Sequence, residues 1–124
     1  MKKLRQSGED YLETILTLSK RGEVRSIDIA NEMSVSKPSV SRAVGILKNG
    51  GLIKVDKDGY ITFTNEGKKT AESVYERHTV LTDWLVGIGV DEKTAAKDAC
   101  RLEHNFSADS FEKLKNHIKN YHKK

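Results

Sequence analysis

Hydrophobic residues recur along most of this chain at the three- and four-residue spacings of amphipathic helices. The spacings predict helices over residues 7–20, 65–86 and 92–105, and a last helix that begins after Ser107. Thr64, Asp91 and Ser107 are the N-caps expected for the last three of these helices. The chain is therefore predicted to be mainly α-helical. The positions expected to pack are Leu12, Ile15, Leu16 and Leu18, then Ala71, Val74, Tyr75, Leu81, Leu85 and Ile88, then Ala95, Ala99, Leu102 and Phe106, and finally Phe111, Leu114, Ile118 and Tyr121.

Residues 26–51 are predicted to form two short helices joined by a tight turn. The second helix is capped by Ser36, whose hydroxyl oxygen accepts an orphan N–H of the first helical turn. Pro38, the only proline, falls in that turn, where a missing N–H costs nothing. The sequence Asn49-Gly50-Gly51 ends this helix. The first helix covers 27–33, and its apolar positions are Ile27, Ile29, Ala30 and Met33.

The second of these short helices has two different faces. One side carries the apolar residues Val40, Ala43, Val44 and Leu47. The opposite side carries small, polar and basic residues: Pro38, Ser41, Arg42, Gly45 and Asn49. Gly45 costs a helix interior about 1 kcal/mol relative to alanine, which indicates a packing or close-approach requirement. Such a helix after a three-residue turn is typical of a helix-turn-helix that enters the DNA major groove, and an ordinary helical hairpin is the alternative.

A β-hairpin is predicted directly after the helix-turn-helix. Two short β-rich runs, 52–55 and 60–63, flank a turn that ends in Gly59. A hairpin in this place is the wing of a winged helix. Lys54 and Lys57 are placed to contact the phosphate backbone of DNA, although solubilising charges at a sheet edge would have the same pattern.

Composition limits the class of protein. The chain has 124 residues, of which 36% are hydrophobic and 32% charged, as in globular proteins of one domain or two small ones. Its net charge of +4 permits nucleic-acid binding. The single cysteine, Cys100, excludes an intrachain disulfide, and no apolar run is long enough to span a bilayer. We therefore expect a cytoplasmic protein with no membrane partner.

Some residues carry metal-ligating chemistry at separate places in the sequence. Asp10 and Glu13 are spaced i, i+3 on the first helix, although a capping box begun by Ser7 and a solvated surface charge also explain them. His78 falls within the apolar stripe of its helix, where a lone histidine is more often a core residue than a ligand.

Cys100, Glu103 and His104 converge on one side of the helix predicted over 92–105. A thiolate, a carboxylate and an imidazole on one helical face form a triple that is able to coordinate a metal. The alternative is a small buried cysteine beside a surface glutamate and histidine. A Cys–His nucleophile is less well supported, because neither an orienting group nor an oxyanion hole is recognisable. No enzymatic activity and no small organic substrate are therefore expected.

Together, the motifs resemble the metal-dependent repressors of the diphtheria toxin repressor and manganese transport regulator family. The resemblance covers essentially the whole chain and rests on GEDYLETI, IANEMSVSKPSVSRAV, FTNEGKK, YERH and DACRLEHNFS, the last of which is quite specific. It implies a winged helix-turn-helix DNA-binding domain over 1–70, followed by an all-helical metal-binding and dimerisation domain over 71–124. It also implies the short form of the family, without the SH3-like domain of longer members.

Position by position, the resemblance implies that the metal ligands are Asp10, Glu13, His78, Cys100, Glu103 and His104. Asp10 and Glu13 match the manganese-sensing branch, whereas Cys100 matches the iron-sensing branch. Oxygen ligands suit Mn(II), and a thiolate favours softer ions such as Fe(II), Co(II) or Zn(II). The expected cofactor is Mn(II), with Fe(II) as the close alternative and Zn(II) or Co(II) able to substitute in vitro. Thr82 and Ala96 stand where longer members have second-site ligands. Because a thiolate bridges metals differently from a carboxylate, Cys100 leaves open whether each subunit holds one metal or two.

The resemblance also implies that Ser36, Pro38 and Arg42 contact bases. The implied function is a transcriptional repressor of metal homeostasis, in which metal promotes the binding of a homodimer to a palindromic double-stranded DNA operator. A winged-helix regulator that responds to a small molecule or to oxidation of Cys100 is the alternative. The full set of residues expected to contact DNA is Ser36, Lys37, Pro38, Ser39, Ser41, Arg42, Lys54 and Lys57.

Overall fold

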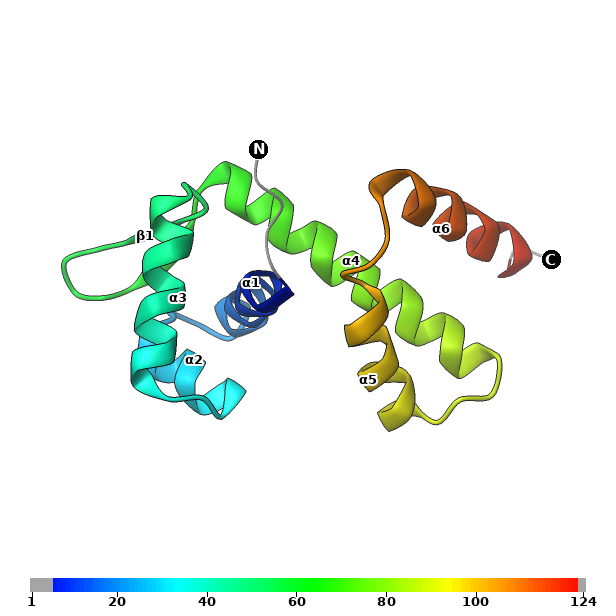
Figure 1. The fold of residues 1–124 in the computed structure, drawn as a ribbon, viewed down its shortest axis with the longest axis horizontal. Coiled ribbons are helices and arrows are strands. Elements are labelled where there is room, and N and C mark those ends of the chain that lie inside the picture. Colours follow the sequence, from blue (N-terminus) through cyan, green and yellow to red (C-terminus); the bar gives the residue numbers. More distant parts are fainter. Residues whose placement is uncertain (1–5, 123–124) are drawn as a thin grey trace. The chain divides into compact units, whose positions relative to one another are not determined.

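The computed structural model describes residues 6–122 of the chain and the side chains of residues 7–120, so the predicted apolar position at Tyr121 lies outside the described side chains. The described part is mainly helical with one two-stranded hairpin after the helix-turn-helix, which confirms the predicted fold class. In chain order (Figure 1) the elements are α1 (Gln6–Ser19), α2 (Ser26–Met33), α3 (Lys37–Asn49), β1 (Ile53–Val55), β2 (Ile61–Phe63), α4 (Asn65–Gly87), α5 (Glu92–Leu102) and α6 (Ala108–His122).

The chain divides into two compact units, Met1–Ser73 and Val74–Lys124. Each unit has a hydrophobic core of its own. α4 begins in the first unit and continues into the second. No helix in the described residues is both long enough and apolar enough to cross a membrane.

The core of the first unit is shared by its helices and its hairpin. On α3, Val40, Val44 and Leu47 are buried, as their spacing predicts. On α2, Ile29 is buried, whereas Ile27, another of its apolar positions, is exposed. Successive helical residues turn by about 100°, so these two side chains point to nearly opposite sides of α2. The buried residues are Tyr11, Leu12, Ile15, Leu16, Val24, Ile29, Ala30, Val40, Val44, Leu47, Leu52, Ile53, Ile61 and Ala71.

The turn between α2 and α3 sets the direction of α3. Ser34 ends α2 in the left-handed conformation, with φ of 55°, and its N–H donates to the carbonyl of Ala30. Ser36 Oγ accepts the N–H of Ser39 at 3.2 Å, which confirms the predicted N-cap. Pro38 lies in the first turn of α3, where its ring is compatible with the helix.

The wing is a short antiparallel hairpin joined to the helix-turn-helix. Ile53 lies opposite Phe63, and Val55 lies opposite Ile61. The N–H of Ile61 also donates to the carbonyl of Val24 at 2.8 Å, which ties the wing to the segment before α2.

The start of α4 is tied to the residues that follow α3. Thr64 Oγ1 accepts the N–H of Gly67 at 3.0 Å, as predicted for an N-cap, and donates to the carbonyl of Gly51 at 2.7 Å. A Cβ atom on Gly67 would overlap the backbone of Leu52. Only glycine therefore allows this close approach.

The second unit is built from α4, α5 and α6. Its core contains Leu81, Ala99 and Phe111, and two of its helices begin at predicted caps. Asp91 Oδ2 accepts the N–H of Thr94 at 3.2 Å, and Ser107 Oγ accepts the N–H of Ser110 at 3.0 Å. These short polar links fix where α5 and α6 start.

Several predicted features of the second unit were wrong. α5 ends at Leu102, not at 105, so Glu103 and His104 follow the helix. Tyr75, Ile88 and Leu102 were predicted to pack and are exposed. The other positions predicted on α4 include Ala71, Val74 and Leu81, and these three are confirmed as buried. Ile88 lies beyond the end of the helix.

Candidate metal centre and nucleic-acid interface

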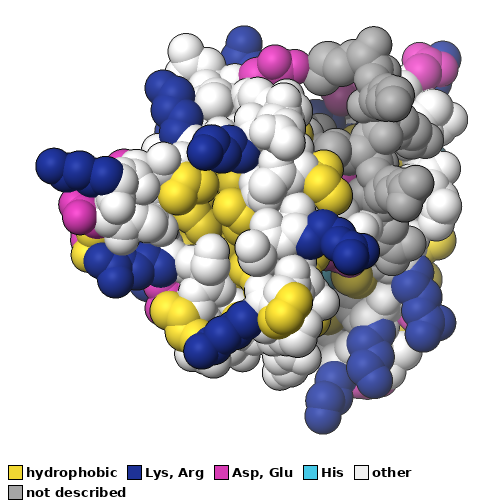
Figure 2. Space-filling model, turned by 60° about the vertical axis from the view of Figure 1, so that its left-hand side comes forward, with side chains coloured by type: hydrophobic (Ala, Val, Ile, Leu, Met, Phe, Trp, Pro, Cys, Tyr) yellow, Lys and Arg dark blue, Asp and Glu magenta, His cyan; other side chains and the backbone are white. Residues whose placement is uncertain are grey.

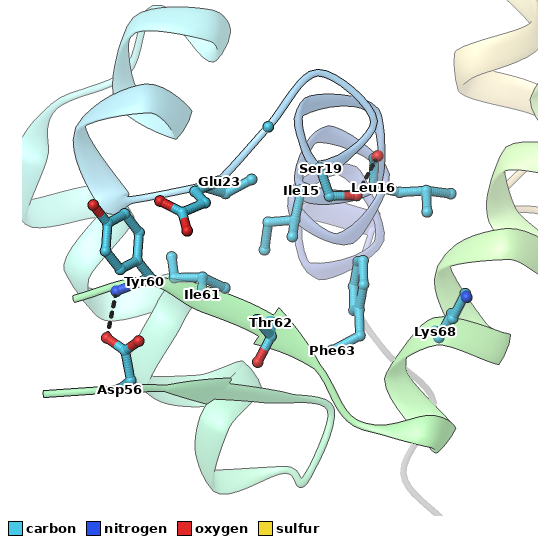
Figure 3. Close-up of a pocket in the computed structure, with 12 residues that line it drawn as sticks. Ile15, Leu16, Ser19, Glu23, Asp56, Tyr60, Ile61, Thr62, Phe63 and Lys68 are labelled. Carbon is cyan, nitrogen blue, oxygen red and sulfur yellow. Dashed lines mark hydrogen bonds between the residues drawn. The ribbon is translucent and has the colours of Figure 1, made fainter. Parts of the chain in front are cut away.

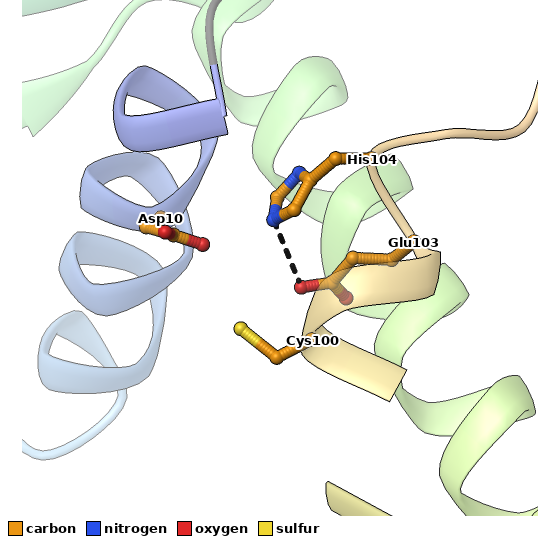
Figure 4. A group of neighbouring side chains, drawn as sticks. All are labelled: Asp10, Cys100, Glu103 and His104. Atoms are coloured by element: carbon orange, nitrogen blue, oxygen red, sulfur yellow. Dashed lines mark ion pairs between the residues drawn. The ribbon is translucent and has the colours of Figure 1, made fainter. Parts of the chain in front are cut away.

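Glu103 has the most deeply buried carboxylate among the described residues. Its side chain is 0% exposed, and His104 beside it is also buried. Glu103 Oε2 lies 3.4 Å from Nδ1 of His78, and Oε1 lies 3.4 Å from Nε2 of His104. Figure 4 shows the pair formed with His104. One buried carboxylate is thus held between imidazoles from α4 and from the segment after α5.

This carboxylate has the surroundings of a metal ligand. Within the described part of the chain, neither of its oxygen atoms accepts a hydrogen bond. A buried carboxylate without hydrogen-bond donors is costly unless a positive charge neutralises it. Carboxylate oxygens and imidazole nitrogens are both good ligands of divalent transition metals. The donor set therefore fits a divalent cation.

Cys100 adds a thiol to the same group. Its Sγ, a carboxylate oxygen of Glu103 and a ring nitrogen of His104 all lie within 4.8 Å of one another. Figure 4 shows these three side chains directed toward a shared space. The structure therefore brings together His78, Cys100, Glu103 and His104, all of which belong to the second unit.

The end of α5 explains how Glu103 and His104 become buried. Asn105 Nδ2 donates to the carbonyl of Arg101 at 2.7 Å, and the Asn105 N–H donates to the carbonyl of Leu102 at 3.0 Å. These bonds satisfy carbonyls of the last turn and turn the chain out of the helix. The alternative that Glu103 and His104 are surface residues is therefore wrong.

Asp10 and Glu13 belong to the first unit, where both lie on α1 and are partly buried. Ser7 is already inside α1, so it does not serve as the N-cap of a box with Asp10. A capping role therefore does not explain Asp10.

The residues predicted to contact DNA all lie on the surface of the first unit. α3 presents Lys37, Pro38, Ser39, Ser41 and Arg42, with the cap Ser36 before them, and all are exposed. Within the described residues, Lys37 and Arg42 form no ion pair. Their charges are therefore available to a polyanion.

The wing carries the other two predicted basic contacts. Lys54 lies on β1 and Lys57 in the turn that follows it; both are exposed and, within the described residues, form no ion pair. Asp56 Oδ1 accepts the N–H groups of Asp58 and Tyr60 at 2.9 Å each, which shapes this turn. Figure 2 shows Lys and Arg side chains standing out from this side of the first unit, with hydrophobic side chains between them.

Sequence reasoning missed two residues near these sites. Ile46 is a large apolar residue on α3 that is 60% exposed. Its position four residues after Arg42, which places both side chains on one face of the helix, could have indicated this exposure. Arg77 precedes His78 in the YERH motif, and its guanidinium contacts the segment that carries Glu103. Nothing in the sequence indicated the contact between Arg77 and this segment, because the two lie far apart in the chain.

A groove of about 560 Å³ also lies within the first unit (Figure 3). Its apolar lining includes Ile15, Leu16, Ile61 and Phe63. Tyr60 stands at this groove and carries the guanidinium of Arg25 at 4.3 Å from its ring centroid. The groove is lined by neither the residues of the metal group nor the exposed face of α3.

The fold and these two sites define a metal-dependent transcriptional regulator that binds DNA. Residues 3–61 match the family model of the iron-dependent repressor N-terminal DNA-binding domain. Residues 64–124 match the model of the iron-dependent repressor metal-binding and dimerisation domain. The chain belongs to the diphtheria toxin repressor and manganese transport regulator family, which is made up of DNA-binding regulators.

Individual relatives agree with this assignment. The chain is 33% identical over 105 residues to the transcriptional regulator MntR of Escherichia coli O6:H1, which covers 84% of this chain and 68% of that protein. It is 34% identical over 109 residues to MntR of Lysinibacillus sphaericus, covering 87% and 78%. The structure of the manganese regulator SloR is similar, with a TM-score of 0.81 and 32% identity. That match covers 90% of this chain and 53% of SloR, so the chain spans about half of its length.

Proposed function

We propose that this chain is a repressor of metal homeostasis whose binding to DNA depends on Mn(II) or Fe(II). The observation that carries this proposal is the buried carboxylate of Glu103, held at 3.4 Å from both His78 and His104. The same chain presents an exposed recognition helix whose Arg42 has no ionic partner among the described residues. A metal-ligand set and a DNA-binding surface in one chain are the two parts that a metal-dependent repressor requires.

The proposed ligands are Asp10, Glu13, His78, Cys100, Glu103 and His104. A bound divalent cation supplies positive charge that offsets the carboxylates of this set. The oxygen donors and the likeness to the manganese regulator SloR favour Mn(II). The thiol of Cys100 favours Fe(II), with Co(II) and Zn(II) as ions that occupy the site in vitro.

The proposed DNA contacts divide into two kinds. On α3, Arg42 is placed to read a guanine, and Pro38 offers apolar contact to a thymine methyl. On the wing, Lys54 and Lys57 contact phosphates, which adds affinity that depends on salt and not on sequence. The other contacts proposed on α3 and its cap are Ser36, Lys37, Ser39 and Ser41.

We propose that the operator is palindromic double-stranded DNA bound by a homodimer. The second unit matches a metal-binding and dimerisation domain and leaves Tyr75, Val86, Ile88 and Leu102 exposed. Large apolar side chains of this kind are typical of the core of a dimer interface. Two recognition helices in a dimer would match major grooves one helical turn apart.

The proposed mechanism is linkage between metal binding and DNA binding. Asp10 and Glu13 belong to the DNA-binding unit, and the other four ligands belong to the second unit. If both groups hold the same ion, their orientation becomes fixed only in the metal-bound protein. By linkage, DNA must then tighten metal binding by the same factor as metal tightens DNA binding, typically about 1–3 kcal/mol.

The test is fluorescence anisotropy of a DNA fragment from the promoter of this protein's own gene, without oxygen. The protein is first treated with chelator, and Mn(II) and Fe(II) are then titrated separately. We expect binding only with metal, and the ion that acts at the lower free concentration is the cofactor. Equally tight binding by chelated protein would overturn the metal dependence. Loss of the response in Cys100→Ser, with no effect of chelator, would favour regulation by oxidation instead.

A further inference from the structure

Arg77 forms an unusual set of contacts inside the second unit. It lies on α4, next to His78. Its Nη1 donates to the carbonyl of Glu103 at 3.0 Å and to the carbonyl of Phe106 at 2.9 Å. Its guanidinium also lies 5.3 Å from the ring centroid of Phe111, which is buried. One side chain of α4 therefore holds both ends of the segment 103–106.

These contacts satisfy groups that the end of α5 would otherwise leave without partners. The last carbonyls of a helix accept no hydrogen bond from the N–H groups of the same helix. The C-terminal end of the helix dipole also attracts a cation. The ring of Phe111 limits the positions that the guanidinium adopts. Arg77 thus restrains the backbone of Glu103 and of the turn that contains His104.

We propose that Arg77 is a positioning residue for the metal centre, an inference that rests on the proposed function. α4 supplies one ligand, His78, and through Arg77 it also positions the backbone that presents two others, Glu103 and His104. Metal sites need ligands held within about 0.5 Å of their working positions, and residues of a turn are held less precisely than residues inside a helix. Loss of such an outer partner typically weakens metal binding by about 10–100-fold.

A purely structural arginine would have a different signature. It would stabilise the second unit without changing the affinity of a correctly folded site. Lysine retains the charge but lacks the planar fork that donates from a fixed orientation. Arg77→Lys therefore keeps the charge, and with it the fold, while it removes the guanidinium that positions the turn.

The experiment measures Mn(II) affinity of the full chain by the electron paramagnetic resonance signal of free Mn(II), together with the melting temperature of the metal-free protein. Arg77→Ala and Arg77→Lys are compared with two controls. Glu76→Gln alters the neighbouring residue, which pairs with Lys115 at 3.4 Å, without touching the turn. Val80→Ala removes a partly buried contact of the core and so controls for lost stability.

We expect Arg77→Ala to raise the Kd for Mn(II) by about 10–100-fold and to do so more than Val80→Ala at a similar loss of melting temperature. Arg77→Lys is expected to melt near the wild-type temperature and still to bind Mn(II) more weakly. The ligand-field absorption of bound Co(II) should change in Arg77→Lys, because it reports ligand geometry, and stay unchanged in Glu76→Gln. If Arg77→Ala does not fold, Arg77→Lys alone decides.

Wild-type Kd and Co(II) absorption in Arg77→Lys would overturn the positioning role. A Kd increase in Arg77→Ala no greater than that of Val80→Ala at equal stability would overturn it as well. The wild-type protein is measured in the same assay. If the wild-type protein binds none of Mn(II), Fe(II), Co(II) or Zn(II), the proposed function fails. If wild type and variants bind Mn(II) equally well, only the positioning role of Arg77 is overturned.

Discussion

A Cβ atom on Gly67 would overlap the carbonyl oxygen of Leu52, so the start of α4 lies directly against the segment that follows the recognition helix. The atoms that this Cβ would overlap belong to the backbone of Leu52, which is unable to rotate away as a flexible side chain would. Gly67→Ala should therefore destabilise the protein by about 1–3 kcal/mol or more, the usual cost of overpacking. Urea unfolding followed by circular dichroism measures this loss, and unchanged stability would show that the contact is looser than described.

Gly45 provides the matched comparison, because a Cβ there would meet no described atom within 4 Å. Gly45→Ala should raise stability by up to about 1 kcal/mol, since alanine is the better helix former. If the glycine serves the close approach of DNA, the same variant should bind its operator more weakly. Anisotropy and urea unfolding of one preparation test both effects. Tight operator binding by Gly45→Ala would show that the approach leaves room for a methyl group.

Glu103→Gln should have opposite effects on the metal-free and metal-bound protein. It removes a buried charge that accepts no hydrogen bond from the described residues, so the metal-free protein should melt at a higher temperature. It also removes the proposed central ligand, so Mn(II) affinity should fall by at least the roughly 10–100-fold that loss of an outer partner costs. Calorimetry with and without Mn(II) measures both. A lower melting temperature of the metal-free variant would indicate that Glu103 stabilises the fold through ion pairs with His78 and His104 alone.

Arg42→Ala and Lys57→Ala should weaken DNA binding in different ways. Arg42→Ala should cost about 1–3 kcal/mol on the operator and relax its sequence preference, as expected for a base contact. Lys57→Ala should weaken specific and random DNA alike and lower the slope of log K against log salt by about 1. Anisotropy at several salt concentrations on both DNAs separates these outcomes. Equal losses on both DNAs for Arg42→Ala would defeat the assignment of this residue to base reading.

Asp91 should add a small acid-sensitive component to stability. Its carboxylate accepts hydrogen bonds from the Thr94 side chain and backbone, and these bonds lower the pKa of Asp91 below its usual value. Because the folded pKa is the lower one, the stabilisation is present above about pH 4 and is lost as the pH falls through the folded pKa. Asp91→Asn should flatten that part of the stability profile, as measured by urea unfolding from neutral to acidic pH. A profile unchanged in the variant would assign the acid sensitivity to other carboxylates.

The order of elements and the caps followed from local sequence. Ser36, Thr64 and Asp91 each cap the helix for which the sequence predicts them, and Val40, Val44 and Leu47 face the interior at helical spacing. These features depend on hydrogen bonds and periodicity within a few residues, which the sequence displays directly. The ligand candidates were less visible, because His78 by itself also fits a core residue and only the resemblance to a family joined it to the others.

The tertiary structure alone showed how Glu103 becomes a buried carboxylate between two imidazoles. Helical spacing placed Glu103 on α5, whereas α5 ends one residue earlier, and Arg77 of another helix holds the carbonyl of Glu103. The close approach of Gly67 to Leu52 was equally invisible in the sequence. Spacing along one helix determines which side chains share a face. Where that helix stops, and what covers its end, depend on contacts between segments far apart in the chain, which only packing establishes.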